Sequence, residues 1–264
     1  MASSTFSLEI NSFINSIIIP FNAWHLDDGT IGGELEQVLR DISEIERNLS
    51  SIGLCLNPQK CEVSILGNPP LVTRQNMLSR VRLIMPGISE TPIGDLTLLG
   101  SPIGVQSLDV SIQLCSRKVK LACERVEGLD SHWALFFVSR YVSAPRVNYL
   151  LRTAPVFTRA SSLHHIDGIV RNTLAKCVDV DTSGATWEQA TLPVRYGGLG
   201  IRSVLDLALP CYNSSLFSSQ TLISEIVGNV AGQSTIELSY QHLLSSVNQV
   251  DRARLVASSL YSGA

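Results

Sequence analysis

Two adjacent carboxylates, Asp27 and Asp28, lie between an apolar stretch and Gly29, in the segment Ala-Trp-His-Leu-Asp-Asp-Gly-Thr-Ile-Gly-Gly that begins at residue 23. An Asp-Gly pair between short apolar runs predicts a β-hairpin, because glycine adopts the positive φ of a tight turn. A hairpin does not require a second aspartate, and neighbouring like charges repel unless a cation or hydrogen bonds neutralise them. Because Mg²⁺ binds one or two carboxylates together with substrate phosphates, this tip is a candidate Mg²⁺ site. A solvated acidic turn is the alternative.

The elements that follow would position this tip. Residues 34–52 carry apolar side chains at gaps of three and four, which predicts a one-faced helix, and Gly53 is a typical helix end. After a turn at Asn57-Pro58, residues 60–67 alternate in polarity and predict a strand. Before that turn comes a short apolar run, Leu54-Cys55-Leu56, so the expected order is hairpin, helix, strand, turn and strand.

These residues, in this order, resemble the palm of reverse transcriptases of non-LTR retrotransposons. The segment from Trp24 to Asp28 is similar to the catalytic Tyr-x-Asp-Asp hairpin of that family (motif C), with His25 in the place of the tyrosine. Residues 53–62, Gly-Leu-Cys-Leu-Asn-Pro-Gln-Lys-Cys-Glu, resemble motif D, and residues 98–104, Leu-Leu-Gly-Ser-Pro-Ile-Gly, resemble the primer-grip hairpin, motif E. Residues 192–201 are similar to a segment beyond the thumb of such elements.

The resemblance implies an RNA-directed DNA polymerase that binds Mg²⁺, an RNA template and a DNA primer. It implies Asp27 and Asp28 as metal ligands and catalytic residues, and Lys60 as a candidate proton donor to the leaving pyrophosphate; a surface lysine is the alternative for Lys60. His25, Leu99 and Gly100 would lie against nucleic acid.

A departure from the family concerns the second half of the metal site. Two-metal phosphoryl transfer needs carboxylates from two segments, and the family's other aspartate (motif A) lies on an earlier strand. Only 26 residues precede Asp27, and Glu9 is the one acid among them. We therefore expect a fragment that lacks the fingers and motif A and is inactive alone. The alternative is a non-catalytic nucleic-acid-binding or protein-interaction module derived from it.

The charge distribution favours a nucleic-acid-binding middle region, although the net charge of the chain is −3. Residues 117–177 contain ten Lys and Arg but four acids, a net charge of +6, which leaves −9 for the rest. A basic thumb beside an acidic palm would hold a duplex; ordinary solvation of helix faces is the alternative. The candidate contacts to nucleic acid here are Arg117, Lys118, Lys120, Arg140 and Arg146.

The remaining patterns are mostly helical. They predict a helix over 71–85, a hairpin over 91–104 containing Gly94-Asp95, and helices over 107–129, 133–151 with a break at Ala144-Pro145, and 158–178. The Gly-rich stretch 197–200 matches no phosphate-binding pattern and predicts a turn. The expected fold is α+β: a partial palm over 1–104 and a mostly helical, thumb-like region over 105–264.

We see no secretory signal in the sequence and therefore expect an intracellular protein, nuclear or cytoplasmic. The run Ile17-Ile18-Ile19 is broken by Pro20 and lacks a basic leader, and no stretch approaches the ~20 apolar residues of a membrane span. The six cysteines show no Cys-x-x-Cys pair, so buried thiols are expected in place of a zinc site or disulfides.

Overall fold

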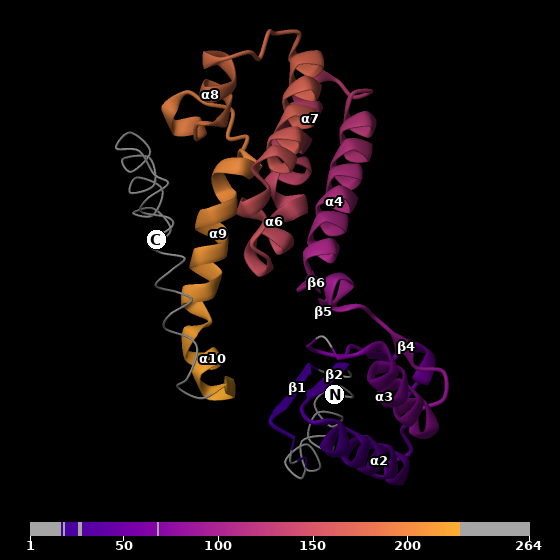
Figure 1. The fold of residues 1–264 in the computed structure, drawn as a ribbon. Helices are drawn as coiled ribbons and strands as arrows, with labels where there is room; N and C mark the ends of the chain where they lie inside the picture. Colours follow the sequence, from indigo (N-terminus) through magenta and orange to yellow (C-terminus); the bar gives the residue numbers. More distant parts are fainter. Residues whose placement is uncertain (1–16, 18, 26–27, 68, 228–264) are drawn as a thin grey trace. The chain divides into compact units, whose positions relative to one another are not determined.

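The computed structural model describes residues 17, 19–25, 28–67 and 69–227, and it combines helices with short strands (Figure 1). This confirms the α+β composition; the identification of a palm and a thumb stays a prediction. The chain divides into two compact units, Met1–Gly100 and Ser101–Ala264, which we describe one at a time. Their boundary falls four residues before the one that we placed at 104/105.

In its described residues the first unit contains short strands, the α-helices α2 and α3, and 3₁₀ turns. Strands β1 and β2 are antiparallel, and β3 pairs with β4 in parallel. In chain order the elements are β1 (Phe21–His25), β2 (Asp28–Gly32), α2 (Leu35–Ser51), η1 (Pro58–Lys60), β3 (Glu62–Val63), α3 (Leu71–Ile84), β4 (Ser89–Glu90), η2 (Ile93–Asp95) and β5 (Thr97–Leu98).

Helix α2 forms where its periodicity predicts it. Its buried apolar residues, among them Leu39, Ile42 and Ile45, recur at helical spacing. Gly53 has a φ of 78°, a left-handed conformation that lets the chain leave the helix. Leu39 and Ile42 pack with Val81, Met85 and Ile88 of α3 and its C-terminal side in a small core. The predicted helix over 71–85 is confirmed in the same core.

The strand predicted over 60–67 is mostly wrong. Only Glu62–Val63 is a strand, Lys60 ends the turn η1, and Leu66 is exposed. The strand expected at residues 54–56, before this turn, is not formed either. Alternation alone does not make a strand, because a strand needs a partner with free backbone groups. Here the partner β4 offers only two residues, Ser89 and Glu90.

The hairpin predicted over 91–104 exists, but its turn is not at Gly94-Asp95, which lie in η2. Strands β5 and β6 (Ser101–Pro102) are paired. Leu99 and Gly100, between them, have φ values of 49° and 75°. Two successive positive φ values are what a two-residue type I′ hairpin turn requires.

The second unit is helical and contains the larger core. Helix α4 packs against α7, and α6 packs against α9 (Figure 1). Fully buried residues from these helices include Val119, Leu151, Ile166, Leu174 and Val204. The elements after β6 are α4 (Val105–Val126), α5 (Ser131–Phe137), the π-helical turn η3 (Val138–Val142), α6 (Ala144–Thr153), η4 (Val156–Arg159), α7 (Ala160–Val178), α8 (Ala185–Thr191), η5 (Val194–Tyr196), α9 (Val204–Ser218) and α10 (Gln220–Val227).

The break predicted inside 133–151 is confirmed and is longer than a kink. Helix α5 gives way to η3, Ser143 leaves the helical region with a ψ of −126°, and Pro145 lies in the first turn of α6. Proline favours this position because its missing N–H has no partner in a first turn. Ser143 Oγ donates a hydrogen bond to the carbonyl of Arg202 (2.6 Å), which fixes the break against the segment before α9.

Within the described ranges, every helix is too short or too polar to cross a membrane.

Candidate functional site

The acidic hairpin is formed, but its turn is displaced from the predicted position. His25 pairs with Asp28, so the chain reverses between them, and Asp28 and Gly29 belong to strand β2. Gly29 is not in a positive-φ conformation, so the prediction that Asp-Gly makes the turn is wrong. Asp27 lies outside the described residues. The paired carboxylates therefore stay a prediction, whereas Asp28 and His25 are exposed cross-strand neighbours at the end of the ladder.

Gly29 is required by the Trp24 side chain rather than by a turn. A Cβ on Gly29 would lie 2.5 Å from the indole ring of Trp24, its cross-strand partner. Glycine within a strand commonly marks such a close approach. Trp24 and Ile31 pack against Ile45 and Leu49, so helix α2 supports the hairpin that carries Asp28.

A buried carboxylate that we did not single out from the sequence also supports this hairpin. Asp41, on α2, is buried, and its Oδ2 accepts a hydrogen bond from the backbone N–H of Ile19 at 3.1 Å. The bond ties the chain before β1 to α2. The burial of Asp41 could have been inferred from its position, because it directly precedes Ile42 within the apolar stripe of the helix.

The remaining candidates of the first unit are Lys60 and the primer-grip residues Leu99 and Gly100. All three are exposed, and Lys60 lies in a different turn from the other two. Lys60 ends η1, where Asn57 Oδ1 caps the turn by accepting the N–H of Gln59 at 3.1 Å. Leu99 and Gly100 form the β5–β6 turn. Over the described residues, no three His, Cys, Asp or Glu side chains are placed to hold a metal ion. With Asp27 undescribed, Mg²⁺ binding stays a prediction.

The three basic candidates of α4 do not share one face. Arg117, Lys118 and Lys120 are all exposed. Since an α-helix turns 100° per residue, Lys118 and Lys120 lie on opposite flanks, with Arg117 facing away from the buried side. These residues can contact a polyanion separately, but they do not form a single patch on this helix.

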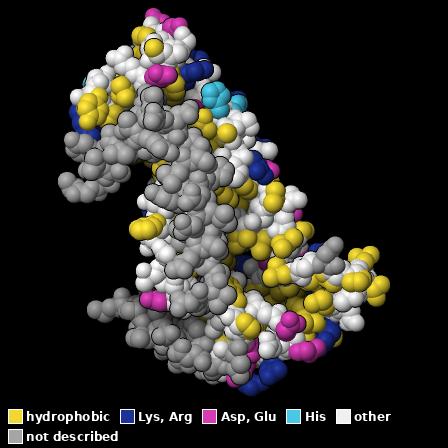
Figure 2. Space-filling model, turned by 60° about the vertical axis from the view of Figure 1, so that its left-hand side comes forward, with side chains coloured by type: hydrophobic (Ala, Val, Ile, Leu, Met, Phe, Trp, Pro, Cys, Tyr) yellow, Lys and Arg dark blue, Asp and Glu magenta, His cyan; other side chains and the backbone are white. Residues whose placement is uncertain are grey.

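Helix α6 does present a basic face. Arg146, Tyr149 and Arg152 are exposed and follow one another at intervals of three, on the side opposite the buried Val147 and Leu151. We had predicted Arg146 as a contact; Arg152 and Tyr149 become candidates only once the buried face is known. In Figure 2, Lys and Arg side chains of the helical unit lie among hydrophobic ones.

Two of the ten basic residues are neutralised locally. Arg159 Nε lies 2.7 Å from Asp109 Oδ1, and Lys176 Nζ lies 3.0 Å from Glu127 Oε1. For Arg140, Arg146 and Arg152 the described part of the chain shows no ion pair.

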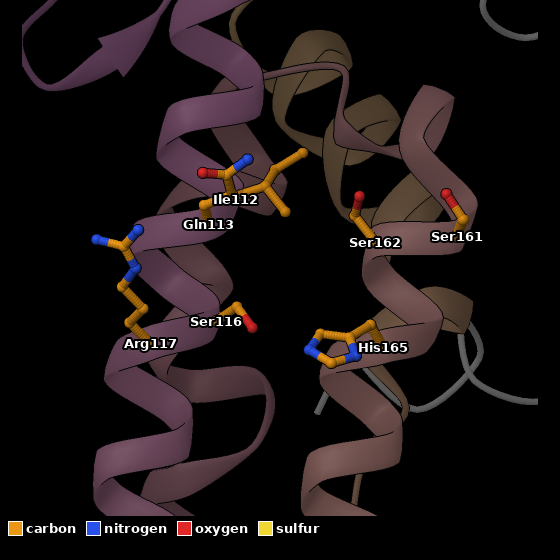
Figure 3. A pocket seen from close by; sticks show the side chains of 7 residues that line it. All are labelled: Ile112, Gln113, Ser116, Arg117, Ser161, Ser162 and His165. Atoms are coloured by element: carbon orange, nitrogen blue, oxygen red, sulfur yellow. The ribbon is translucent and has the colours of Figure 1, made fainter.

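A shallow groove of about 420 Å³ runs between α4 and α7 (Figure 3). His165 and Ser162, from α7, face Ser116 of α4 across it, while the guanidinium of Arg117 points away from α7. Its wall contains no acid; the lining residues are Ile112, Gln113, Ser116, Arg117, Ser161, Ser162 and His165. The groove is open to solvent.

A second groove has a volume of about 210 Å³, and Asp167, a buried carboxylate on α7, is one of the residues that line it. Asp167 Oδ1 accepts the N–H of Val204 (2.7 Å), and Oδ2 accepts the hydroxyl of Ser203 (2.8 Å) and the N–H of Leu205 (3.1 Å). Burial raises the pKa of Asp167 and these hydrogen bonds lower it, with burial the larger effect. The carboxylate thus caps the N-terminus of α9 from a neighbouring helix, a structural role.

The thiols show no sign of activation. All six cysteines are free; Cys123 and Cys177 are buried, Cys55 is exposed, and the others are intermediate. Buried thiols were therefore predicted correctly for two of the six. Burial raises the pKa of Cys123, and of Cys61, Cys115, Cys177 and Cys211, which disfavours the reactive thiolate.

No protein-family model, curated protein or solved structure matches this chain.

Proposed function

We propose that this chain is a palm-and-thumb part of a reverse transcriptase of the non-LTR type, and that its helical unit binds the backbone of a template–primer duplex. Support for the ancestry comes from the motif C-, D- and E-like segments and from the hairpin that carries Asp28. Support for duplex binding comes from the helical unit, and one observation carries it: the exposed face of α6 bears Arg146, Tyr149 and Arg152 without an acid.

The surroundings of α6 strengthen this argument. Residues 131–178 contain six Lys and Arg but one acid, Asp167. Asp167 is 5% exposed and its oxygens accept three hydrogen bonds, so it adds little repulsion at the surface. Arg159 and Lys176 are paired with Asp109 and Glu127, which leaves four positive charges of this segment to attract phosphates, even though the whole chain carries −3.

Nucleotide addition is the activity that the resemblance implies for the family. It requires carboxylates from two segments to hold two ions ~3.5–4 Å apart. Asp27 and Asp28 would supply one side of that site. In a longer chain that also supplies the opposing carboxylate, Asp27→Ala should abolish nucleotide addition and Asp28→Ala should reduce it less; retention of activity in Asp27→Ala would place the site elsewhere.

Duplex binding is tested with the purified chain and a blunt RNA–DNA hybrid at several salt concentrations. We expect log Kd to rise linearly with log salt, and Arg146→Ala or Arg152→Ala to reduce the magnitude of the slope by about one phosphate contact. The matched control is Lys176→Ala, which removes the same charge from a side chain that is already paired with Glu127. No binding at low salt, or equal slopes in all three variants, would refute the proposal.

A further inference from the structure

A cluster of exposed aromatic side chains projects from α5 and η3. Trp133, Phe136 and Tyr141 are 56%, 44% and 55% exposed, and Phe137 is 36% exposed. Ala134 and Val138, on the other side of the same segment, are fully buried. The segment is therefore anchored in the core on one side and turns rings to solvent on the other. Apolar patches of this kind mark interaction sites in proteins.

The rings hold one another in defined orientations. Trp133 meets Phe136 edge to face with ring centroids 6.2 Å apart, and Phe136 meets Phe137 at 5.6 Å. Tyr141 lies 6.0 Å from Phe136 and 5.9 Å from Phe137. Tyr141 belongs to the π-helical turn η3, a conformation that often occurs at functional sites. Ordering such rings in advance lowers the entropic cost of binding a flat ligand.

The charged residues near the cluster in the sequence indicate which class of ligand it binds. Arg140 is exposed within η3. The exposed Asp130 directly precedes α5, and no further Asp or Glu occurs before Asp167. Exposed rings with an exposed cation, on a segment where the exposed Asp130 before α5 is the one acid ahead of Asp167, are the combination on which unpaired bases stack while their phosphates are neutralised. An apolar protein surface would use the rings but would gain nothing from the cation and the scarcity of acids.

We propose that the aromatic cluster Trp133, Phe136, Phe137 and Tyr141, with Arg140, is a stacking site for unpaired nucleotides of single-stranded nucleic acid. It is distinct from the α6 face to which we assign duplex binding, and it requires neither metal binding nor polymerase ancestry. The two proposals fail separately, because a blunt hybrid offers no unpaired bases and a homopolymeric single strand offers no duplex.

The test uses the full chain and a fluorescently labelled 12-nucleotide oligo-dT at low salt. We expect Trp133→Ala and Tyr141→Ala each to weaken binding about fivefold to a hundredfold, the range for loss of one stacked base. Trp133→Phe should restore most of the affinity, and binding to the blunt hybrid should be unchanged. Circular dichroism verifies that each variant is folded.

The matched control is Phe217→Ala, which removes another exposed ring (72% exposed) from α9 of the same unit and should leave oligo-dT binding unchanged. Absence of oligo-dT binding by the unsubstituted chain would overturn the proposal, as would equal affinity in Trp133→Ala and Phe217→Ala. If an apolar dye binds the cluster while oligo-dT does not, the surface serves an apolar partner, and stacking of bases is excluded.

Discussion

Replacement of Asp167 should destabilise the helical unit, because this buried carboxylate is the acceptor for two backbone N–H groups at the start of α9. In Asp167→Ala the N–H groups of Val204 and Leu205 lose their acceptor. An unsatisfied buried donor costs about 1–3 kcal/mol. Part of this loss is offset because the alanine variant no longer buries a charge. We expect the free energy of unfolding to fall by about 2–4 kcal/mol.

Asp167→Asn should have an intermediate effect. The amide has one oxygen, which would keep the shortest bond, to the N–H of Val204 at 2.7 Å. Its NH₂ group can donate to the Ser203 hydroxyl if that hydroxyl reorients, which leaves Leu205 N–H, the longest bond at 3.1 Å, without an acceptor. One unsatisfied donor in place of two predicts about half the loss seen with alanine.

The dependence on pH provides an independent check. Burial raises the pKa of Asp167 above its ordinary value of 3.8, so the folded state binds a proton more readily than the unfolded state. The resulting stabilisation is fully present below pH 3.8 and is lost as the pH rises through the raised, folded-state pKa. The difference in stability between the unsubstituted chain and Asp167→Asn should therefore decrease over that window as pH increases.

Urea unfolding of the three proteins, followed by circular dichroism from pH 3.5 to 7.5, measures both effects. The control is Glu124→Gln, an exposed acid on α4 of the same unit. If Asp167→Ala and Glu124→Gln have equal free energies of unfolding, the carboxylate does not cap α9. A difference between unsubstituted chain and Asp167→Asn that increases with pH would show that hydrogen bonding, rather than burial, dominates the pKa.

Three glycine substitutions test positions where a side chain is disfavoured, two by a close approach and one by a positive φ. In Gly198→Ala the new Cβ would lie 2.0 Å from the carbonyl oxygen of Leu192, so urea unfolding should show a loss of about 3 kcal/mol, the upper end of overpacking effects. Gly197→Ala has open space but a φ of 78°, so its loss should be smaller, about 1–2 kcal/mol; equal losses would contradict this order. Gly29→Ala should displace the Trp24 ring and speed hydrogen exchange of the β1–β2 amides, and unchanged exchange would show that the ring does not fix this hairpin.

Helices were predicted well from the sequence because their hydrogen bonds are local. The stripes that predicted helices over 34–52 and 107–129 depend only on residues three and four apart, and α2 and α4 lie there. The helix predicted over 71–85, where the periodicity is mixed, is α3. Strands were predicted poorly because each needs a partner whose position is not encoded locally. Residues 60–67 alternate as a strand should, yet only Glu62 and Val63 find partners.

The same reasoning explains which parts of the candidate site could be predicted. The acidic hairpin was located, but not its turn, since the packing of Trp24 on Gly29 decides the register and the sequence does not show that contact. Asp41 and Asp167 went unrecognised because a single acid in an apolar stripe does not identify the backbone N–H that it accepts. A count of charges likewise located a basic region without showing which charges are neutralised.

Once the buried residues are known, the counted charges can be placed on the surface of the protein. Once Val147 and Leu151 are known to face the core, helical geometry places Arg146, Tyr149 and Arg152 together on the outer side of α6. The same step separates the rings of α5 from the buried Ala134 and Val138. Both surfaces follow from residues 131–152, in which no acid occurs. A segment that is anchored in the core on one side and is basic and aromatic on the other is suited to hold nucleic acid without any metal.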